Sequence, residues 1–185
     1  MPGQVQDKIS RAHALNNYGV LLADQHRFDE AIASYEEALR LHPGYPEANN
    51  NIALALVQIG KLDDAASHYK RALELKPDYA DAHNNYAVLC GTLDRDKDAL
   101  EHYNKAISLY GDAISSDHRN AYPHNNLALL LVKLDKLDEA EAEYKKALAI
   151  YPEYVDANNN YAMLLRKLGK DGQAEIFLKK ALGIS

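Results

Sequence analysis

The sequence predicts an all-α fold, built as a solenoid of five repeated helix-turn-helix units. Two observations lead to this prediction. An Asn-Asn pair recurs along the chain, and its second members, at steps of 34, 34, 41 and 34 residues, are Asn17, Asn51, Asn85, Asn126 and Asn160. Each unit also carries two stripes of apolar residues at helical spacing, with a polar break between them. A period of this length is typical of stacked helical repeats.

The composition predicts a folded chain in a reducing compartment. Hydrophobic residues make up 47% of the sequence and charged residues 26%, which is normal for a soluble protein. The formal net charge is -6, whereas a protein that binds the phosphates of a nucleic acid is usually basic. We therefore expect no nucleic-acid partner. A single cysteine, Cys90, excludes an intramolecular disulfide, and no apolar run suggests a signal peptide or a membrane span. We therefore expect a cytoplasmic protein with no membrane partner.

The first unit follows a short lead-in at residues 1–11 and covers residues 12–45. Its first half predicts a helix, because Leu15, Tyr18 and Leu22 fall on one stripe. A polar break follows at residues 25–27, and a second stripe runs from Phe28 to Leu39. Pro43 and the glycine after it end this second helix.

The later units repeat this pattern over residues 46–79, 80–113, 121–154 and 155–185. The extra seven residues of the long step, 114–120, are assigned to an extension of the second helix of the third unit. This extension is either a tolerated variation in length or a tip that makes a dedicated contact. The second helices have characteristic residues at fixed positions, which we call their marks. They are two alanines, such as Ala65 and Ala72, with a tyrosine such as Tyr69 between them. Small side chains there let neighbouring helices approach, and the tyrosine fills the space between them.

These marks resemble those of the tetratricopeptide repeat family, over roughly residues 12–185. The resemblance implies a right-handed α-α superhelix of five repeats that binds protein segments in a concave groove. One departure is clear, because the bulky aromatic position of the first helix holds Leu15, Asn49, His83, His124 and Asn158. We expect this departure to weaken one contact within each repeat.

Helical geometry predicts which side chains line the groove. If each unit is numbered from its first residue, positions 4, 7, 8 and 11 fall on the core side and positions 5, 6 and 9 on the opposite side. Positions 5 and 6 hold the Asn pairs: Asn16 and Asn17, Asn50 and Asn51, Asn84 and Asn85, Asn125 and Asn126, Asn159 and Asn160. Position 9 holds apolar residues: Val20, Leu54, Val88, Leu129 and Met163.

This pattern predicts a groove for an extended peptide or protein segment. An amide both donates and accepts, so a row of amides can pair with successive peptide groups of a ligand, and the apolar residues can contact its side chains. The row resembles the asparagine ladder in the tetratricopeptide arm of O-linked N-acetylglucosamine transferases, with Asn17, Asn51, Asn85, Asn126 and Asn160 as the matching residues. The alternative is structural, because asparagines also bond to neighbouring repeats or cap local backbone.

The same positions argue against a chaperone adaptor. The carboxylate clamp of co-chaperone tetratricopeptide domains requires Lys, Asn, Asn, Lys and Arg at five positions, and this chain has Asn16, Val20, Asn51, Asp81 and Asn85 there. Cationic residues do occur at positions 12 and 13 of the last two units, as Lys133, Arg166 and Lys167. They form either a secondary contact for an acidic ligand or an ordinary solvated face.

Nothing in the sequence predicts an enzyme, a metal site or a cofactor. There is no His-Glu-x-x-His, no Cys-x-x-Cys and no Gly-rich phosphate loop. His83 and His124 stand one repeat apart at what we interpret as a surface-type position, too far apart to share a metal. Cys90 falls at core position 11, which is typical of a buried, unreactive thiol.

Two other functions remain open. The second helix of the last unit carries Ala174, Leu178, Ala181 and Leu182 with no following helix to cover them, which favours self-assembly through this end. Alternatively, the chain is a recruiting arm that works with a separate enzyme.

Overall fold

The computed structural model describes residues 2–184, and in that range the chain forms ten α-helices and no β-strand. The helices form five pairs, which we number as repeats 1 to 5. Their bounds are α1 (Pro2–Asp24), α2 (Phe28–Leu41), α3 (Pro46–Gln58), α4 (Leu62–Leu75), α5 (Ala80–Thr92), α6 (Asp96–Ser116), α7 (Ala121–Lys133), α8 (Leu137–Ile150), α9 (Val155–Lys167) and α10 (Asp171–Ala181). The chain is all-helical, a series of helix-turn-helix repeats, as predicted.

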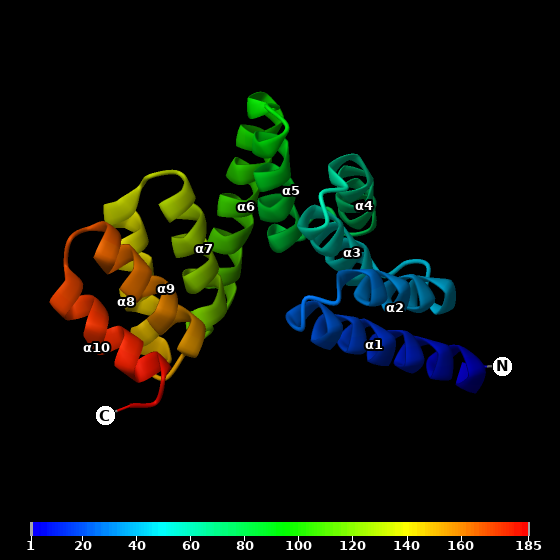
Figure 1. The fold of residues 1–185 in the computed structure, drawn as a ribbon, viewed down its shortest axis with the longest axis horizontal. Helices are drawn as coiled ribbons and strands as arrows, with labels where there is room; N and C mark the ends of the chain where they lie inside the picture. Colours follow the sequence, from blue (N-terminus) through cyan, green and yellow to red (C-terminus); the bar gives the residue numbers. More distant parts are fainter. Residues whose placement is uncertain (1, 185) are drawn as a thin grey trace. The chain divides into compact units, whose positions relative to one another are not determined.

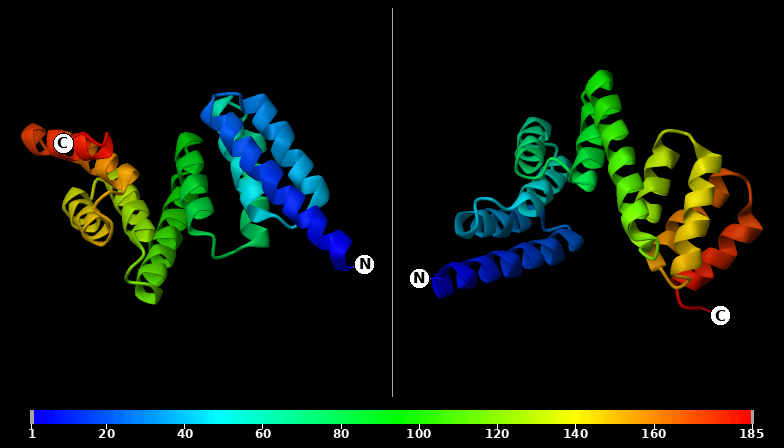
Figure 2. Two further views of the ribbon diagram at one scale, coloured as in Figure 1. Left: turned by 90° about the horizontal axis from the view of Figure 1, so that it is seen from below. Right: turned by 180° about the vertical axis from the view of Figure 1, so that it is seen from behind.

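The helices divide into two compact units, Met1–Ala106 and Ile107–Ser185, and the boundary falls within α6. In the first unit each helix from α1 to α5 packs against the next one along the chain (Figure 1). In the second unit α7 packs on α8, α8 on α9 and α9 on α10 (Figure 2). Contacts are therefore local in sequence, because each helix pair buries its apolar faces against its neighbours.

Small residues and tyrosines build the core as the sequence predicts. At the two marked positions of the second helices every alanine but the half-buried Ala181 is buried, and Ala31, Ala65, Ala72, Ala140 and Ala147 have no exposed surface. The tyrosine between them is also buried in three repeats, as Tyr35, Tyr69 and Tyr144. In repeat 3 the equivalent Tyr103 is only half-buried. Each buried ring contributes ~1.5–3 kcal/mol through the apolar surface it removes from water.

One of these rings is accommodated by a glycine. A Cβ atom built on Gly19 would lie 2.5 Å from Cε1 of Tyr35, closer than non-bonded carbon atoms approach. The other repeats have Ala53, Ala87, Ala128 and Ala162 at this position of the first helix. Gly19 therefore gives the ring of Tyr35 a closer approach to α1 than an alanine would permit.

The turn inside each repeat uses a left-handed residue at the same place. The five residues with this positive φ are His26 (59°), Gly60 (77°), Asp94 (55°), Asp135 (57°) and Gly169 (72°). Glycine adopts this conformation freely, whereas an L side chain costs roughly 1–2 kcal/mol there. The chain thus keeps one turn geometry through all five repeats, even where the residue type is unfavourable.

Two helices are longer than the others. α1 is continuous from Pro2, so residues before the first repeat extend its first helix. α6 runs to Ser116, and Tyr110, two turns before that end, is buried. Across residues 2–184, no helix combines the length and apolar character needed to cross a lipid bilayer.

Candidate peptide-binding face

Asparagines of the first unit are joined by hydrogen bonds from one repeat to the next. Asn85 Nδ2 donates to Asn50 Oδ1 over 3.2 Å, and Asn51 Nδ2 donates to Asn16 Oδ1 over 3.0 Å. Within repeat 2, Asn50 Nδ2 contacts Asn51 Oδ1 at 3.4 Å. The result is a chain of four amides that crosses α1, α3 and α5.

The second unit repeats this arrangement between α7 and α9. Asn160 Nδ2 donates to Asn125 Oδ1 over 3.2 Å, and Asn125 Nδ2 donates to Asn126 Oδ1 over 3.1 Å. The rule is the same in both units: the second Asn of a pair donates to the first Asn of the preceding pair. We call the surface of the first helices that carries these amides the amide face.

Burial separates the two members of the pair in repeats 1, 2 and 4, but not in repeats 3 and 5. The first members Asn16, Asn50 and Asn125 are buried, at 3 to 6% exposed, whereas Asn84 and Asn159 are half-buried. The second members Asn51, Asn85, Asn126 and Asn160 are half-buried and Asn17 is exposed. An asparagine amide has two N–H groups and two oxygen lone pairs, of which Asn51 uses one each. The second members thus remain accessible to a ligand.

Apolar side chains lie beside these amides. Val20, Leu54 and Val88 are 37 to 39% exposed, and Met163 is 68% exposed, whereas Leu129 is half-buried. Between α1 and α3 a cavity of about 190 Å³ opens at this place, and Val20, Leu54 and Asn51 are among the residues that line it. An exposed apolar wall next to a half-exposed amide can contact a ligand side chain and its backbone together.

The charged residues of this face are exposed or weakly paired. Glu47 contacts Lys76 at 3.5 Å, and Lys167 Nζ donates to Asp135 Oδ1 over 2.9 Å. Lys133 and Arg166 are exposed. At the end of the last repeat Ala174 is fully buried and Leu178 and Ala181 are half-buried, while Leu182 is 69% exposed.

A set of buried polar pairs inside the repeats was not predicted. In repeats 2, 3 and 4 the residue at the bulky aromatic position of the first helix forms a hydrogen bond. Its partner is the residue 19 positions later, on the second helix. In repeat 2, His68 Nδ1 donates to Asn49 Oδ1 over 3.1 Å, and in repeat 4 His124 Nδ1 donates to Glu143 Oε2 over 2.6 Å. Polar pairs therefore occupy the place of an aromatic contact.

The pair in repeat 3 consists of two histidines, whose nitrogens His83 Nδ1 and His102 Nδ1 are 2.8 Å apart. His83 Nε2 lies 3.1 Å from the carbonyl oxygen of Pro77, which can only accept, so His83 carries its proton on Nε2. The lone pair of His83 Nδ1 then accepts the N–H of His102. Protonation of His83 would place two N–H groups face to face.

Burial sets the charge state of these histidines. Desolvation is the main cause that lowers the pKa of His68, His83 and His102 below the ordinary value of 6.5. For His102 the neighbouring His83 lowers the pKa further. These rings are accordingly neutral at pH 7, and the two hydrogen bonds of His83 require its neutral form.

The expectation that His83 and His124 occupy surface positions was wrong, because they are only 8% and 6% exposed. They lie buried because their hydrogen bonds satisfy the ring nitrogens inside the repeat. Sequence signals for this existed: His83 and His124 both stand at position 4, which the helical numbering puts on the core side, and polar residues recur 19 apart, as His83 with His102. Cys90 is buried as predicted, and burial raises the pKa of its thiol. No cluster of three or more metal-ligating side chains occurs among the described residues.

Solved structures of tetratricopeptide repeat proteins superpose on this chain. TTC0263 of Thermus thermophilus, a thermophilic protein of that kind, is 25% identical, with 94% of this chain and 91% of that one covered at a TM-score of 0.72. YrrB, described as having an unusual peptide-binding site, is 20% identical, with 100% and 91% covered at a TM-score of 0.51. MamA of Desulfovibrio magneticus RS-1 is 16% identical, with 94% of each chain covered at a TM-score of 0.53.

The family model described as tetratricopeptide repeat matches in four overlapping segments, residues 10–78, 46–112, 78–153 and 121–185. No curated protein sequence gave a significant match. The family match covers nearly the whole chain and agrees with the helix pairs, their small-residue marks and the solved relatives. The chain belongs to the tetratricopeptide repeat family.

Proposed function

We propose that this chain is a non-catalytic interaction scaffold that binds an extended peptide or protein segment along its amide face. Membership of a family of protein-interaction modules supports a protein partner. The observation that carries the more specific proposal is the amide chain from Asn85 to Asn16, beside the exposed residues Val20, Leu54 and Val88.

The hydrogen bonds between repeats hold these amides in fixed orientations before a ligand arrives. A preorganised group loses less conformational entropy on binding than a mobile one. Asn51 keeps one N–H and one oxygen lone pair, which match the C=O and N–H groups of a peptide backbone. Each such bond contributes ~0.5–1.5 kcal/mol, so several along the face add up to useful affinity.

The same bonds also support the structural alternative, in which the asparagines only join the repeats. The two roles differ in what they predict for neighbours that form no bond between repeats. Leu54 is such a neighbour, because it lies on the amide face and is 39% exposed. Only the binding role requires its side chain.

A display library of random 12-residue peptides provides the probe. The whole chain serves as bait, and the affinity of the selected peptide is measured by fluorescence anisotropy. Leu54→Arg should weaken binding roughly tenfold or more, because a charge replaces an apolar contact. Ala33→Arg adds the same charge at an exposed position of α2 and should change affinity less than about twofold. Equal effects of the two variants would refute binding at the amide face.

A second candidate function is self-association through α10 and the residues after it. Ile176, Leu182 and Ile184 are 54 to 69% exposed there. Light scattering over a range of concentrations tests this role, with Leu182→Glu as the variant that should keep the chain monomeric. A wild-type chain that stays monomeric at every concentration would exclude it.

A further inference from the structure

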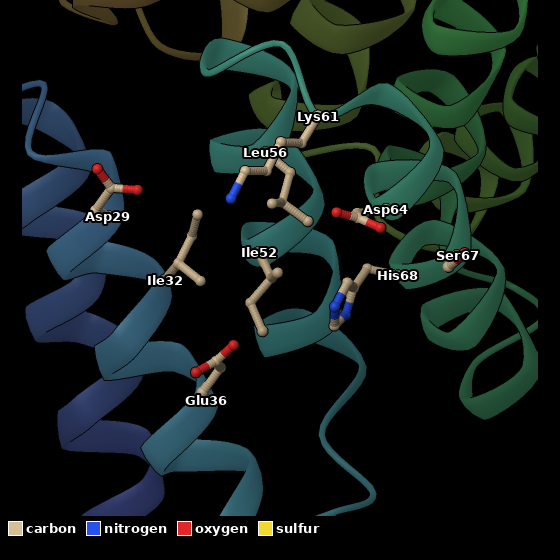
Figure 3. A pocket seen from close by; sticks show the side chains of 9 residues that line it. All are labelled: Asp29, Ile32, Glu36, Ile52, Leu56, Lys61, Asp64, Ser67 and His68. Carbon is tan, nitrogen blue, oxygen red and sulfur yellow. The ribbon is translucent and has the colours of Figure 1, made fainter.

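A second cavity in the first unit lies away from the amide face. It has a volume of about 270 Å³ and is bounded by α2, α3 and α4 (Figure 3). α3 supplies Ile52 and Leu56 to its floor, whereas Leu54 of the same helix lies on the amide face. Adjacent helical residues differ by about 100°, so Ile52 and Leu54 point to opposite sides of α3. The cavity is therefore a separate feature from the proposed peptide face.

The cavity exists because a ring is missing. Ile52 stands where repeats 3 and 5 have Tyr86 and Tyr161. In those repeats the ring packs on the second helix, with centroids 4.7 Å apart for Tyr86 and His102 and 4.6 Å apart for Tyr161 and Phe177. An isoleucine side chain is too short to make this contact, which leaves the space against His68 open.

The opening of the cavity is acidic. Asp29, Glu36 and Asp64 line it, are exposed, and form no ion pair with another described residue. Among the described residues that line the cavity, Lys61 is the only Lys or Arg. In Figure 3 Lys61 is drawn near Leu56, at the opposite end of the cavity from Glu36. Three carboxylates against one ammonium leave an excess of negative charge.

His68 adds a neutral acceptor. Its Nδ1 proton is donated to Asn49, so the second ring nitrogen, Nε2, carries a lone pair. The ring is drawn beside Ile52 at the cavity in Figure 3. Desolvation by burial lowers the pKa of His68, which keeps this lone pair available at neutral pH.

We propose that this cavity binds an arginine side chain of a protein partner. The methylene groups of arginine fit the apolar floor of Ile32, Ile52 and Leu56, while the guanidinium reaches the acidic opening. A planar group with five N–H donors suits acceptors on different helices, here Glu36 on α2 and Asp64 and His68 on α4. The net charge of -6 favours approach of a basic segment. The inference does not depend on the amide face.

The test uses n-butylguanidinium, which reproduces the arginine side chain, together with its neutral isostere n-butylurea and with n-butylammonium. Each compound is titrated into the whole chain at pH 7.5, and the His68 ring signals are followed by NMR. We expect n-butylguanidinium to give a saturable shift, at least fivefold tighter than either analogue. Binding should weaken several-fold when salt is raised from about 50 to 300 mM, because the contacts are charged.

Two cavity-filling variants and one matched pair of charge variants locate the site. Ile52→Tyr supplies the ring that repeats 3 and 5 contain and should abolish the saturable shift, and Leu56→Phe fills the same space from the next turn if the first variant does not fold. Asp64→Asn should weaken binding at least threefold. Asp98→Asn, at the equivalent position of repeat 3 beside Tyr86, should leave it unchanged. Unchanged binding in a folded cavity-filling variant, or binding of n-butylurea or n-butylammonium as tight as that of n-butylguanidinium, would overturn the proposal.

Discussion

The interface between repeats 1 and 2 and that between repeats 4 and 5 use the same positions but differ in how they are filled. In the second unit, Tyr161 packs on Phe177 and its hydroxyl donates to Glu141 over 3.2 Å. Lys170 Nζ donates to the other oxygen of Glu141 over 2.8 Å. In the first unit Ile52, His68 and Ile32 stand at the positions of Tyr161, Phe177 and Glu141, and a cavity remains.

This difference shows that repeats of one family can share a backbone and differ in their surfaces. Tyr161 and Ile52 are both almost completely buried, so neither interface lacks a core. The ring and the ion pair fill space that the shorter side chains leave open to solvent. The residue at this position of the first helix, with the residues that it contacts on the neighbouring second helices, distinguishes the filled interface from the one with a cavity.

The largest expected effect comes from exchanging these residues. Tyr161→Ile should destabilise the chain by ~2–4 kcal/mol, because it removes a buried ring, its contact with Phe177 and the hydrogen bond to Glu141. Ile52→Tyr should stay within about 1 kcal/mol of wild type, since the added ring enters existing space. Urea unfolding measures both. Tyr161→Phe, which loses only the hydroxyl, should cost ~0.5–1.5 kcal/mol. Similar losses for the two exchanges would contradict the comparison.

A smaller loss of stability is expected at acidic pH. Neutral His68, His83 and His102 have lowered pKa values, so below pH 6.5 the unfolded chain binds more protons and the first unit loses stability. In the second unit, hydrogen bonds from Lys145 and Lys170 lower the pKa of Glu141 to about 2. The stabilisation from Glu141 is full above pH 4.5 and is lost only as pH falls toward 2.

The first unit should therefore loosen before the second as pH falls from 6.5 to 4.5. Hydrogen-exchange mass spectrometry at pH 7.5 and 5.5, corrected for the intrinsic exchange rate, measures this. We expect protection to fall in α3, α4 and α5 and to persist in α8 and α9. Earlier loss of protection in the second unit would refute this account of the histidines.

The smallest effect concerns the turns of the first and last repeats. His26 has a φ of 59° where repeat 5 has Gly169 at 72°. His26→Gly should stabilise the chain by ~0.5–1 kcal/mol, because glycine relieves the left-handed strain while the ring contact with Phe28 is lost. Gly169→Ala should destabilise it by about 1 kcal/mol. Thermal unfolding measures both, and a lower midpoint for His26→Gly would show that the ring contact outweighs the strain.

The repeat number, the helix pairs and the tyrosine and alanine core were predictable because they depend on local periodicity. Ala31 and Tyr35 recur at fixed spacing, and burial follows from that spacing. The pairing of His83 with His102 was missed because it depends on which residues of the two helices face each other across the turn. A shift of one residue in either helix would separate the two rings. The cavity at Ile52 was missed because a sequence shows which atoms are present and not the volume they leave.

Periodicity predicted a row of asparagine pairs opposite the core side, but it predicted neither their hydrogen bonds nor the burial of the first members Asn16, Asn50 and Asn125. Periodicity placed Asn51 and Asn85 opposite the core side. That they donate to Asn16 and Asn50 of the preceding repeats depends on the offset between stacked helices, which no single repeat specifies. The hydrogen bonds between repeats agree with the structural role, and the binding role stays a proposal that only a ligand can test.

The most direct test of the central proposal is an N-methyl scan of the peptide selected with the wild-type chain. Methylation removes a backbone N–H without changing the side chain, so it probes the backbone contacts that the amide face is proposed to make. We predict that methylation at two or more alternate positions weakens binding at least tenfold, while alanine substitution at those positions has a smaller effect. Affinity that falls only on side-chain substitution, and never on methylation, would contradict recognition of the peptide backbone by the asparagines.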